Sequence, residues 1–463
     1  MTAKQWFSWH SLSGVWFGLL LFVICWTGAF ATISYELDWL FDETVRAPES
    51  SPQVSLASAY EKVQETYPDA RIGIAFAGAE AHFAHDFVVR LPDNPWQHIY
   101  VDPYTGNIQG ETSFLNIQRF FRDFHMHFFG VFDSIVSYYL VLVFAIPITI
   151  STLTALYLYR GWWRKFFTLK LSGDTRAKVA STHKLAGVWS LWLAVVIAVT
   201  SMWYLFEFVR MDLADGKTAY TDVGQFAVNP LPELAAQDKP QLSVVTLAAK
   251  VKEARPDLDI RAIRYSGGYF YAEGQANDVL VRDRANKVYV NPYTGEIVYS
   301  QTASSQGLYW RLSDTADPLH FGNFAGVWVK ILWCIFGLAL SFLVLSGTYM
   351  YVKRQLKLRR KEDLRGVKVS LGLSGALLLC IGYYAYHTLM GYGIAGQFPV
   401  LPLGSKLFLV VWTLLTCAII AIWIKALLNL CREATLVNKP EAKPKAKSQA
   451  NSKAKPKVSH HHL

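Results

Sequence analysis

The stretch WHSLSGVW at residues 9–16 decides the fold, because it returns almost unchanged as THKLAGVW at residues 182–189. Both copies place a histidine, and a glycine four residues later, at the start of a long apolar run. Self-similarity of this kind is typical of a chain built from related units. We therefore expect two related halves, each opening with a helix that carries a histidine near one membrane surface.

Long apolar runs follow both copies and recur through a chain of 463 residues that is 52% hydrophobic. A helix of about 20 apolar residues crosses a hydrocarbon layer of about 30 Å, so we expect a polytopic α-helical membrane protein with six spans. The predicted order is span one at 1–35, outer domain one at 36–126, span two at 127–160, a basic loop at 161–182, span three at 183–209, outer domain two at 210–319, span four at 320–352, a basic loop at 353–368, spans five and six at 369–431, and a disordered basic tail at 432–463.

The net charge of +10 is concentrated beside the apolar runs. Lysine and arginine gather in the two loops and the tail. This distribution predicts how the spans are oriented in the membrane, and it does not indicate a nucleic-acid-binding surface. Both loops, the N-terminus and the C-terminus are therefore expected on the cytoplasmic side of a bacterial inner membrane, with both outer domains in the periplasm. All five cysteines lie in or beside apolar runs, so no disulfide framework is expected.

Each outer segment repeats one pattern. SLASAYEKVQETYPD (55–69) and SVVTLAAKVKEARPD (243–257) have the apolar spacing of an amphipathic helix. β-rich stretches follow, with nearly identical turns YVDPYTG (100–106) and YVNPYTG (289–295), in which Asp-Pro or Asn-Pro precedes a glycine. We predict two small α+β domains, one in each half.

Histidines at the ends of spans are candidate ligands, because an ionisable group in hydrocarbon is costly unless something binds it. Two imidazoles on facing helices are a common way to hold haem iron in a bundle. The repeat pairs His10 with His183 on the inner side and His320 with His125 or His127 on the outer side, and alignment through the tyrosines of spans two and four favours His127. The candidates are His10, His183, His125, His127, His320 and His387.

The roles of His387 and of single histidines at the membrane surface leave alternatives open. His387 is expected either as an outer ligand or in an acceptor site, and any single interfacial histidine has the alternative of a polar residue at headgroup level. The outer-domain histidines His82, His85 and His98 lack counterparts in the other half, so we expect them on the solvated surface.

Small residues and arginines accompany the candidate ligands. Gly14 and Gly187 lie one turn from the inner histidines, where a flat macrocycle needs room. Five turns further along the same faces stand Gly28 and Ser201. The arginines just before the outer histidines are candidates for pairing with carboxylates of the macrocycle, namely Arg119, Arg122 and Arg311.

The two turns, the His-x-x-x-Gly span starts, Leu319-His320 and the run SGTYMY at 346–351 resemble the PepSY-associated transmembrane family, over about residues 1–355. Spans five and six carry no such motif. The resemblance implies PepSY-like outer domains and, from some members, an inner-membrane ferric-siderophore reductase with two b-type haems. Haem b as cofactor and a ferric siderophore as acceptor are therefore expectations from resemblance.

Two further functions compete with this expectation. In one, the protein is a haem-free scaffold or regulator whose outer domains bind peptides or restrain a peptidase. In the other, the haems are retained and the acceptor is a quinone or a thiol protein. No Gly-x-Gly-x-x-Gly after a strand, P-loop or His-Glu-x-x-His occurs in the sequence, so electrons are expected from a cytoplasmic partner or a quinol.

Overall fold

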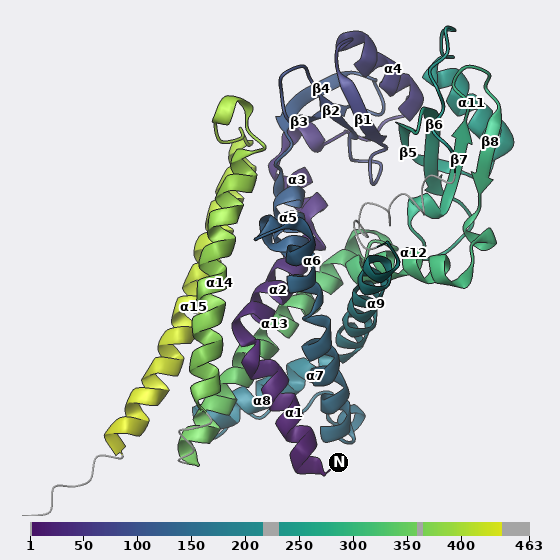
Figure 1. Ribbon diagram of the computed structural model, residues 1–463. Coiled ribbons are helices and arrows are strands. Elements are labelled where there is room, and N and C mark those ends of the chain that lie inside the picture. Colours follow the sequence, from purple (N-terminus) through teal and green to yellow (C-terminus); the bar gives the residue numbers. More distant parts are fainter. Residues whose placement is uncertain (1, 216–230, 359–363, 438–463) are drawn as a thin grey trace, which may run out of the picture.

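The computed structural model describes residues 2–215, 231–358 and 364–437. A helical bundle carries a β-sheet at one end, and a helical hairpin of α14 and α15 stands along one side of the bundle (Figure 1). The predicted tail beyond residue 437 and residues 359–363 of the second basic loop lie outside the described residues.

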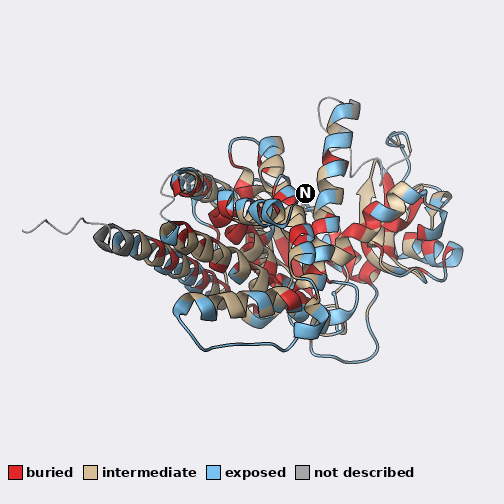
Figure 2. Cartoon of the chain, turned by 90° about the horizontal axis from the view of Figure 1, so that it is seen from below, coloured by how far each residue is buried: buried red, intermediate tan, exposed pale blue. Residues whose placement is uncertain are grey.

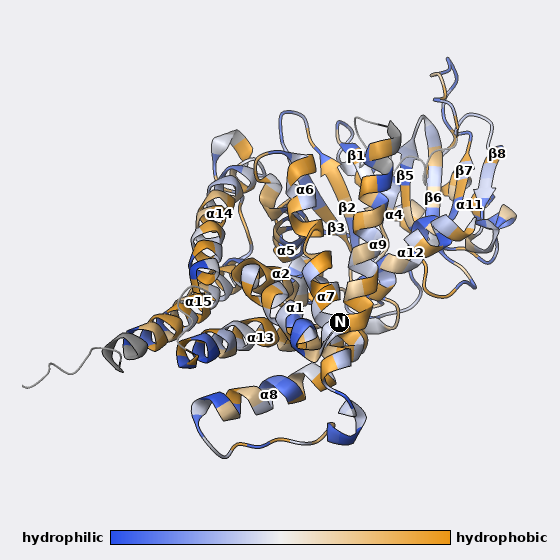
Figure 3. Ribbon diagram, turned by 60° about the horizontal axis from the view of Figure 1, so that its bottom comes forward, coloured by the Kyte–Doolittle hydropathy of each residue, from blue (hydrophilic) through white to orange (hydrophobic). Residues whose placement is uncertain are grey.

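Five helical segments in the described chain are long and apolar enough to cross a membrane. The helices of the bundle are mostly coloured as hydrophobic, whereas one end of α13 and parts of α8 are hydrophilic (Figure 3). The chain is thus a polytopic membrane protein in contact with a lipid bilayer. The segments are α6 with α7 (Ser134–Leu142 and Ala145–Leu158), α9 (Leu191–Asp215), α13 (Gly326–Lys357), α14 (Leu364–Met390) and α15 (Leu403–Val437).

The first predicted span is not one straight helix. It divides into α1 (Ala3–Trp16) and α2 (Gly18–Ala31), which are bent by 73° about Phe17, so the chain has six candidate spans only if this bent pair counts as one. Gly18 follows the break, and a Cβ there would lie 2.9 Å from the hydroxyl of Thr348. The bend thereby lets α2 approach α13 closely.

The second half repeats this break. α8 (Thr175–Trp189) ends before Ser190, and α9 begins immediately after it. Phe17 and Ser190 have similar non-helical backbone angles, with ψ of 7° and 2°. Phe17 and Ser190 are as many residues apart in the chain as His10 and His183, so the break is part of the internal repeat. Sequence analysis missed it because neither break contains proline.

Shorter helices connect the spans to the outer region. α3 follows α2, α5 precedes α6, and α12 precedes α13. α5 ends in the left-handed residue Phe128, and α12 ends in the left-handed residue Gly322. The bounds are α3 (Ser34–Phe41), α5 (Ile117–His127) and α12 (Leu308–Phe321), with short 3-10 turns at Glu43–Val45, Phe128–Gly130, Trp162–Lys165, Asp283–Ala285, Ala303–Ser305 and Ile394–Gly396.

The outer segments form one antiparallel sheet of eight strands in the order β4-β3-β2-β1-β5-β6-β7-β8. The two predicted α+β domains are therefore joined edge to edge through β1 and β5, where Ala75 pairs with Ile263. The strands are β1 (Arg71–Phe76), β2 (His85–Arg90), β3 (Trp96–Val101), β4 (Ile108–Ser113), β5 (Asp259–Ser266), β6 (Tyr269–Gln275), β7 (Asn286–Val290) and β8 (Ile297–Gln301).

Both predicted amphipathic helices are confirmed as α4 (Leu56–Thr66) and α11 (Val244–Ala254). The hydroxyls of Ser55 and Ser243 cap their N-termini, and both helices contribute to one apolar core with the sheet. Buried residues lie along this core and where the bundle helices meet (Figure 2). Because the two segments share a core, neither buries its apolar face alone.

The repeated turns are also confirmed. The side chains of Asp102 and Asn291 accept hydrogen bonds from the backbone two residues ahead, at 2.8 and 2.9 Å. Gly106 and Gly295 follow in the left-handed region, with φ of 71° and 74°. These turns require glycine because other residues rarely adopt such angles.

Asp38 on α3 holds the start of α5. Its carboxyl accepts hydrogen bonds from the backbone amides of Ile117 at 2.8 Å and Gln118 at 2.9 Å. These amides have no partner inside the helix, so the two oxygens of the Asp38 carboxyl accept hydrogen bonds that the helix itself cannot provide. Burial raises the pKa of Asp38 to about 7, against the opposing effect of the two amide bonds.

We predict that Asp38 makes stability depend on pH. The folded carboxyl retains its proton to about pH 7, whereas in the unfolded chain it ionises near pH 4, so the free energy of unfolding falls as pH rises through this window. Asp38→Asn should flatten this slope in thermal unfolding of the detergent-solubilised protein. An unchanged slope in the variant would contradict the assignment.

Candidate functional site

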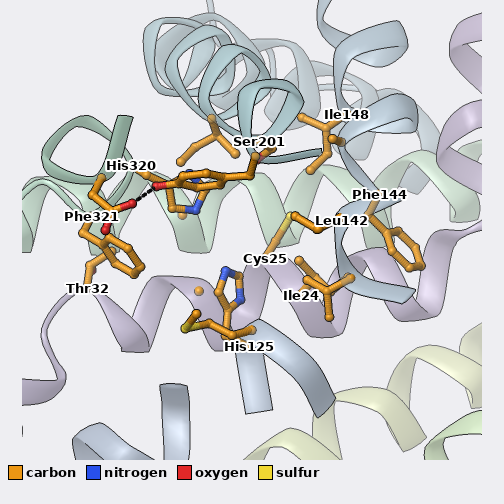
Figure 4. Close-up of a pocket in the computed structure, with 18 of the residues that line it drawn as sticks. Ile24, Cys25, Thr32, His125, Leu142, Phe144, Ile148, Ser201, His320 and Phe321 are labelled. Carbon is orange, nitrogen blue, oxygen red and sulfur yellow. Dashed lines mark hydrogen bonds between the residues drawn. The ribbon is translucent and has the colours of Figure 1, made fainter. Parts of the chain in front are cut away.

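Two histidines from different halves meet at the outer end of the bundle. His125 projects from α5 and His320 from α12 into the same space, from opposite sides (Figure 4). Their ring centres are 6.3 Å apart, with planes inclined by 41°. The side chain that faces His320 is therefore His125, and not His127, which the alignment of the halves favoured.

Each outer histidine is oriented by a threonine of its own half. The Nδ1 of His125 lies 3.2 Å from the hydroxyl of Thr27, and the Nδ1 of His320 lies 2.8 Å from that of Thr200. Both hydroxyls donate their single proton to a backbone carbonyl one turn earlier, of Val23 or Val196, at 2.8 Å. Each hydroxyl must then accept from the imidazole N–H. This arrangement protonates Nδ1 and leaves the lone pair of Nε2 available.

The inner histidines are held in the same way. The Nδ1 of His10 lies 3.1 Å from the carbonyl of Ser151 and 3.0 Å from the hydroxyl of Thr154. The Nδ1 of His183 lies 2.8 Å from the hydroxyl of Ser346, which donates to the carbonyl of Phe342 at 2.7 Å. The carbonyl of Ser151 cannot donate, and the hydroxyl of Ser346 already gives its proton to Phe342, so Nδ1 carries the proton in both inner histidines. The two inner imidazoles lie within electrostatic range of each other.

Four imidazoles with a fixed Nδ1–H and a free Nε2 have the arrangement that metal-binding histidines usually show. A metal–imidazole bond of about 2 Å on each side, plus about 1 Å from each nitrogen to its ring centre, gives centres about 6 Å apart. The outer pair matches this separation, so its geometry fits a haem iron bound between the two rings. Within the described residues, three or more His, Cys, Asp or Glu side chains never gather in a group that would hold a bare metal ion.

A cavity of about 390 Å³ surrounds the outer pair. Such a volume falls within the range of about 300–1,000 Å³ usual for ligand and cofactor sites. Its walls are mostly apolar and come from both halves, among them Ile24, Cys25, Leu142, Phe144, Ile148, Leu193, Ile197, Phe321 and Leu340. An apolar chamber with two opposed imidazoles suits a flat hydrophobic macrocycle.

Gly28 makes room for His125. A Cβ on this residue would lie 2.7 Å from Cε1 of His125, closer than real contacts allow. The repeat predicts that Gly28 and Ser201 leave space for a macrocycle, and both line the cavity. The closest constraint on Gly28 is nevertheless the imidazole itself.

Charged groups of the second outer domain reach the rim of the cavity. Arg282 forms an ion pair with Asp317, one turn before His320 on α12. Asp317 also accepts a hydrogen bond of 2.5 Å from Tyr204, whose ring lies 5.2 Å from that of His320. Burial alone would raise the pKa of Asp317, but the charge of Arg282 and the bond from Tyr204 outweigh it and lower the pKa.

The predicted arginines separate into two groups. Arg122 lines the cavity, as do Arg282 and Arg284. Arg119 lies over the ring of Phe114, and Arg311 pairs with Asp278. Arg282 and Arg284 could not be predicted from the sequence, because they lie far from the outer histidines along the chain.

The remaining histidines lie elsewhere. His127 contacts Asp123 at 3.3 Å and the ring of Tyr138 at 5.2 Å. His387 is exposed on α14 and contacts Tyr383. The expectation that His85 and His98 lie on the solvated surface is wrong, because both are 6% exposed. His98 bonds to Asp86 at 2.7 Å, a partner that offsets the cost of its burial in the sheet.

The hydroxyls that orient the histidines were also missed, although the repeat marks them. Thr27 and Thr200 are separated by the same interval as His10 and His183. Thr154 and Ser346 each stand three residues before the tyrosine that aligns spans two and four. A search for hydroxyl residues at repeat-equivalent positions would have found all four.

The family described as PepSY-associated TM region matches residues 7–354. The match includes both histidine pairs and both halves of the sheet, and it ends before spans five and six. None of the curated proteins matches the chain.

We predict that Gly28→Ala destabilises the protein by about 1–3 kcal/mol, because the added methyl group must displace His125 in a packed interior. Gly14→Ala is the matched control, since a Cβ on Gly14 meets nothing within 4 Å. Thermal unfolding in detergent measures both. Equal destabilisation of the two variants would contradict the close contact with His125.

Proposed function

The chain belongs to the PepSY-associated transmembrane family, and from this premise we propose that it transfers electrons across a membrane through two b-type haems to an acceptor on the outer side. The observation that carries the proposal is the set of four histidines with a fixed Nδ1–H, two of which face each other at a separation of 6.3 Å. Haem b, when bound, supplies reversible one-electron chemistry between Fe(III) and Fe(II).

Residues of this chain would hold the haems, orient their ligands and keep water away from them. His10 and His183 are proposed to hold the inner haem, and His125 and His320 the outer haem. Thr27, with its counterparts in the other three sites, keeps each ligand in the correct tautomer. The apolar cavity walls exclude water, while arginines at the rim are suited to carboxylates. Two haems at two depths would let electrons cross the hydrocarbon layer.

We propose a ferric siderophore as the acceptor and a quinol or a cytoplasmic protein as the donor. One electron from the outer site would reduce Fe(III) in the chelate to Fe(II), which hard oxygen ligands bind more weakly. The proposed setting is a bacterial inner membrane, with both termini cytoplasmic and the sheet in the periplasm. The basic residues of the loop before α8 support this orientation.

Absorption spectra of the purified protein test the proposal directly. A Soret band and an α-band that respond to dithionite, at two haems per chain, are expected, followed by reoxidation on adding a ferric hydroxamate chelate. Reoxidation by a quinone but not by the chelate would redirect the assignment of the acceptor. A colourless protein would contradict the proposal and favour a haem-free scaffold that binds peptides.

We predict that His125→Ala and His320→Ala each lose the outer haem and retain the inner one, while His10→Ala and His183→Ala do the reverse. His127→Ala is the matched control, because His127 contacts Asp123 instead of facing His320. Haem content and the potentials of the remaining haem measure the outcome. Loss of a haem in His127→Ala, with retention in His125→Ala, would refute the outer pair.

Removal of an orienting hydroxyl should weaken binding without removing a ligand. Thr27→Val and Thr200→Val are predicted to lower the affinity of the outer haem by about 10–100-fold. Thr152→Val is the control, since this buried hydroxyl also donates to its own helix, at 2.9 Å to Ile148. Equal haem retention in all three variants, measured by transfer to apomyoglobin, would contradict the orienting role.

A further inference from the structure

Helix α14 lies outside the residues that match the family, yet it contacts two backbone breaks of the first half. One break, at Phe17, separates α1 with His10 from α2. The other, at Phe128–Gly130, separates α5 with His125 from α6. A broken helix in hydrocarbon leaves carbonyls without partners, and these must be satisfied within the protein.

At the inner break, the hydroxyl of Ser370 on α14 donates to the carbonyl of Trp16 and lies 3.4 Å from that of Val15. Gly366, one turn earlier on α14, makes room for the ring of Trp16, to which an added Cβ would come within 3.3 Å. Span five therefore supplies the hydrogen bond that the end of α1 lacks.

At the outer break, Thr388 on α14 donates a hydrogen bond of 2.8 Å to the carbonyl of Phe129. Phe128 and Phe129 both have positive φ, 46° and 57°, which is strained for bulky residues. Tyr392, just beyond α14, donates to Asp123 on α5 at 2.5 Å. Ser370 and Thr388 are 18 residues apart, so they lie on one face of α14 five turns from each other.

The second half needs no such helix. At its inner break, Ser190 occupies the position of Phe17 and its own hydroxyl donates to the carbonyl of Ala186 at 2.7 Å. At its outer break, the left-handed position belongs to Gly322, which adopts φ of 69° without strain. The first half thus has an unsuitable residue at each break, and α14 contacts both.

We infer that α14 stabilises the two breaks of the first half, a role that we call a splint. Ser370 and Thr388 are then positioning residues for His10 and His125. This inference rests on the proposed function for its link to haem. Its structural content, the support of two breaks by two hydroxyls, holds for the protein with or without haem. It gives span five a role in the site without any ligand of its own.

The first test uses two single variants. Ser370→Ala should weaken retention of the inner haem alone, and Thr388→Val that of the outer haem alone, by roughly three- to tenfold for one hydrogen bond in a membrane protein. The α-band and potential of each haem distinguish the two sites. Ser374→Ala is the control, because this buried serine of α14 has no hydrogen bond to either break in the described chain. Equal loss of both haems in either variant would overturn the inference.

A second-site substitution that copies the second half provides a rescue test. Phe128→Gly places a glycine at the left-handed end of α5, as Gly322 does at the end of α12. It should restore the outer haem in Thr388→Val by removing the strain. Failure of this rescue would overturn the inference for the outer break, because a general loss of packing by α14 would not respond to a change at the end of α5.

Amide hydrogen exchange of the full chain in detergent separates the inference from the proposed function. Thr388→Val should speed exchange in residues 126–132 and Ser370→Ala in residues 15–21, each roughly three- to tenfold and without change at the other break. This result in a protein that binds no haem would support the splint and refute the haem function. Unchanged exchange at both breaks would refute the splint.

Discussion

The site depends on one repeated interaction, the hydrogen bond from an imidazole Nδ1–H to a hydroxyl that is itself anchored to its helix backbone. The anchor removes the freedom of the hydroxyl, since its single proton is already given to a carbonyl. The histidine consequently has one tautomer, in which Nδ1 carries the proton and Nε2 keeps its lone pair. Without that anchor, a half-buried imidazole would have two tautomers and several partners.

This interaction always stays within one half, whereas the facing outer pair joins the two halves. Thr27 and His125 belong to the first half, and Thr200 and His320 to the second. Each half therefore orients its own histidine, and the association of the halves brings the outer two together. The continuous sheet supports this arrangement, because β1 and β5 join the two outer segments at one end of the helical bundle (Figure 1). In a bilayer each break in a helix costs free energy, because its unpaired backbone groups find no water to bind.

The sequence predicted the parts of the structure that periodicity and repetition encode. The five apolar helices after the first predicted span, both amphipathic helices and the turns at Asp102 and Asn291 were foreseen, because each has a local physical signature. The repeat singled out His10, His183 and His320, whose role as ligands stays a prediction. The alignment favoured His127, but His125 is the residue that faces His320. The two histidines are two residues apart, which is about 200° around α5, so they cannot face the same way.

Features that depend on contacts between distant segments were not predictable in this way. The junction of β1 with β5 is an edge-to-edge pairing that neither segment encodes alone, and Arg282 reaches the cavity only because the second outer domain sits on α12. Burial of His98 depends on Asp86 from a neighbouring strand. A sequence pattern predicts which face of a helix or strand is apolar, but the tertiary structure determines the partner of a buried charged group.

The two halves have the same arrangement of helices and histidines, but they differ in the charged groups around the cavity. In the second half, Asp317 connects His320 through Tyr204 and Arg282 to the outer domain. In the first half, Asp123 instead contacts Arg119, His127 and Tyr392, which lead to the sheet and to spans five and six. His320 thus connects through Tyr204 to an ion pair of the second outer domain, whereas Asp123 joins α5, the helix that carries His125, to the added hairpin. Repeat symmetry in the histidines is therefore compatible with different surroundings on the two sides of the cavity.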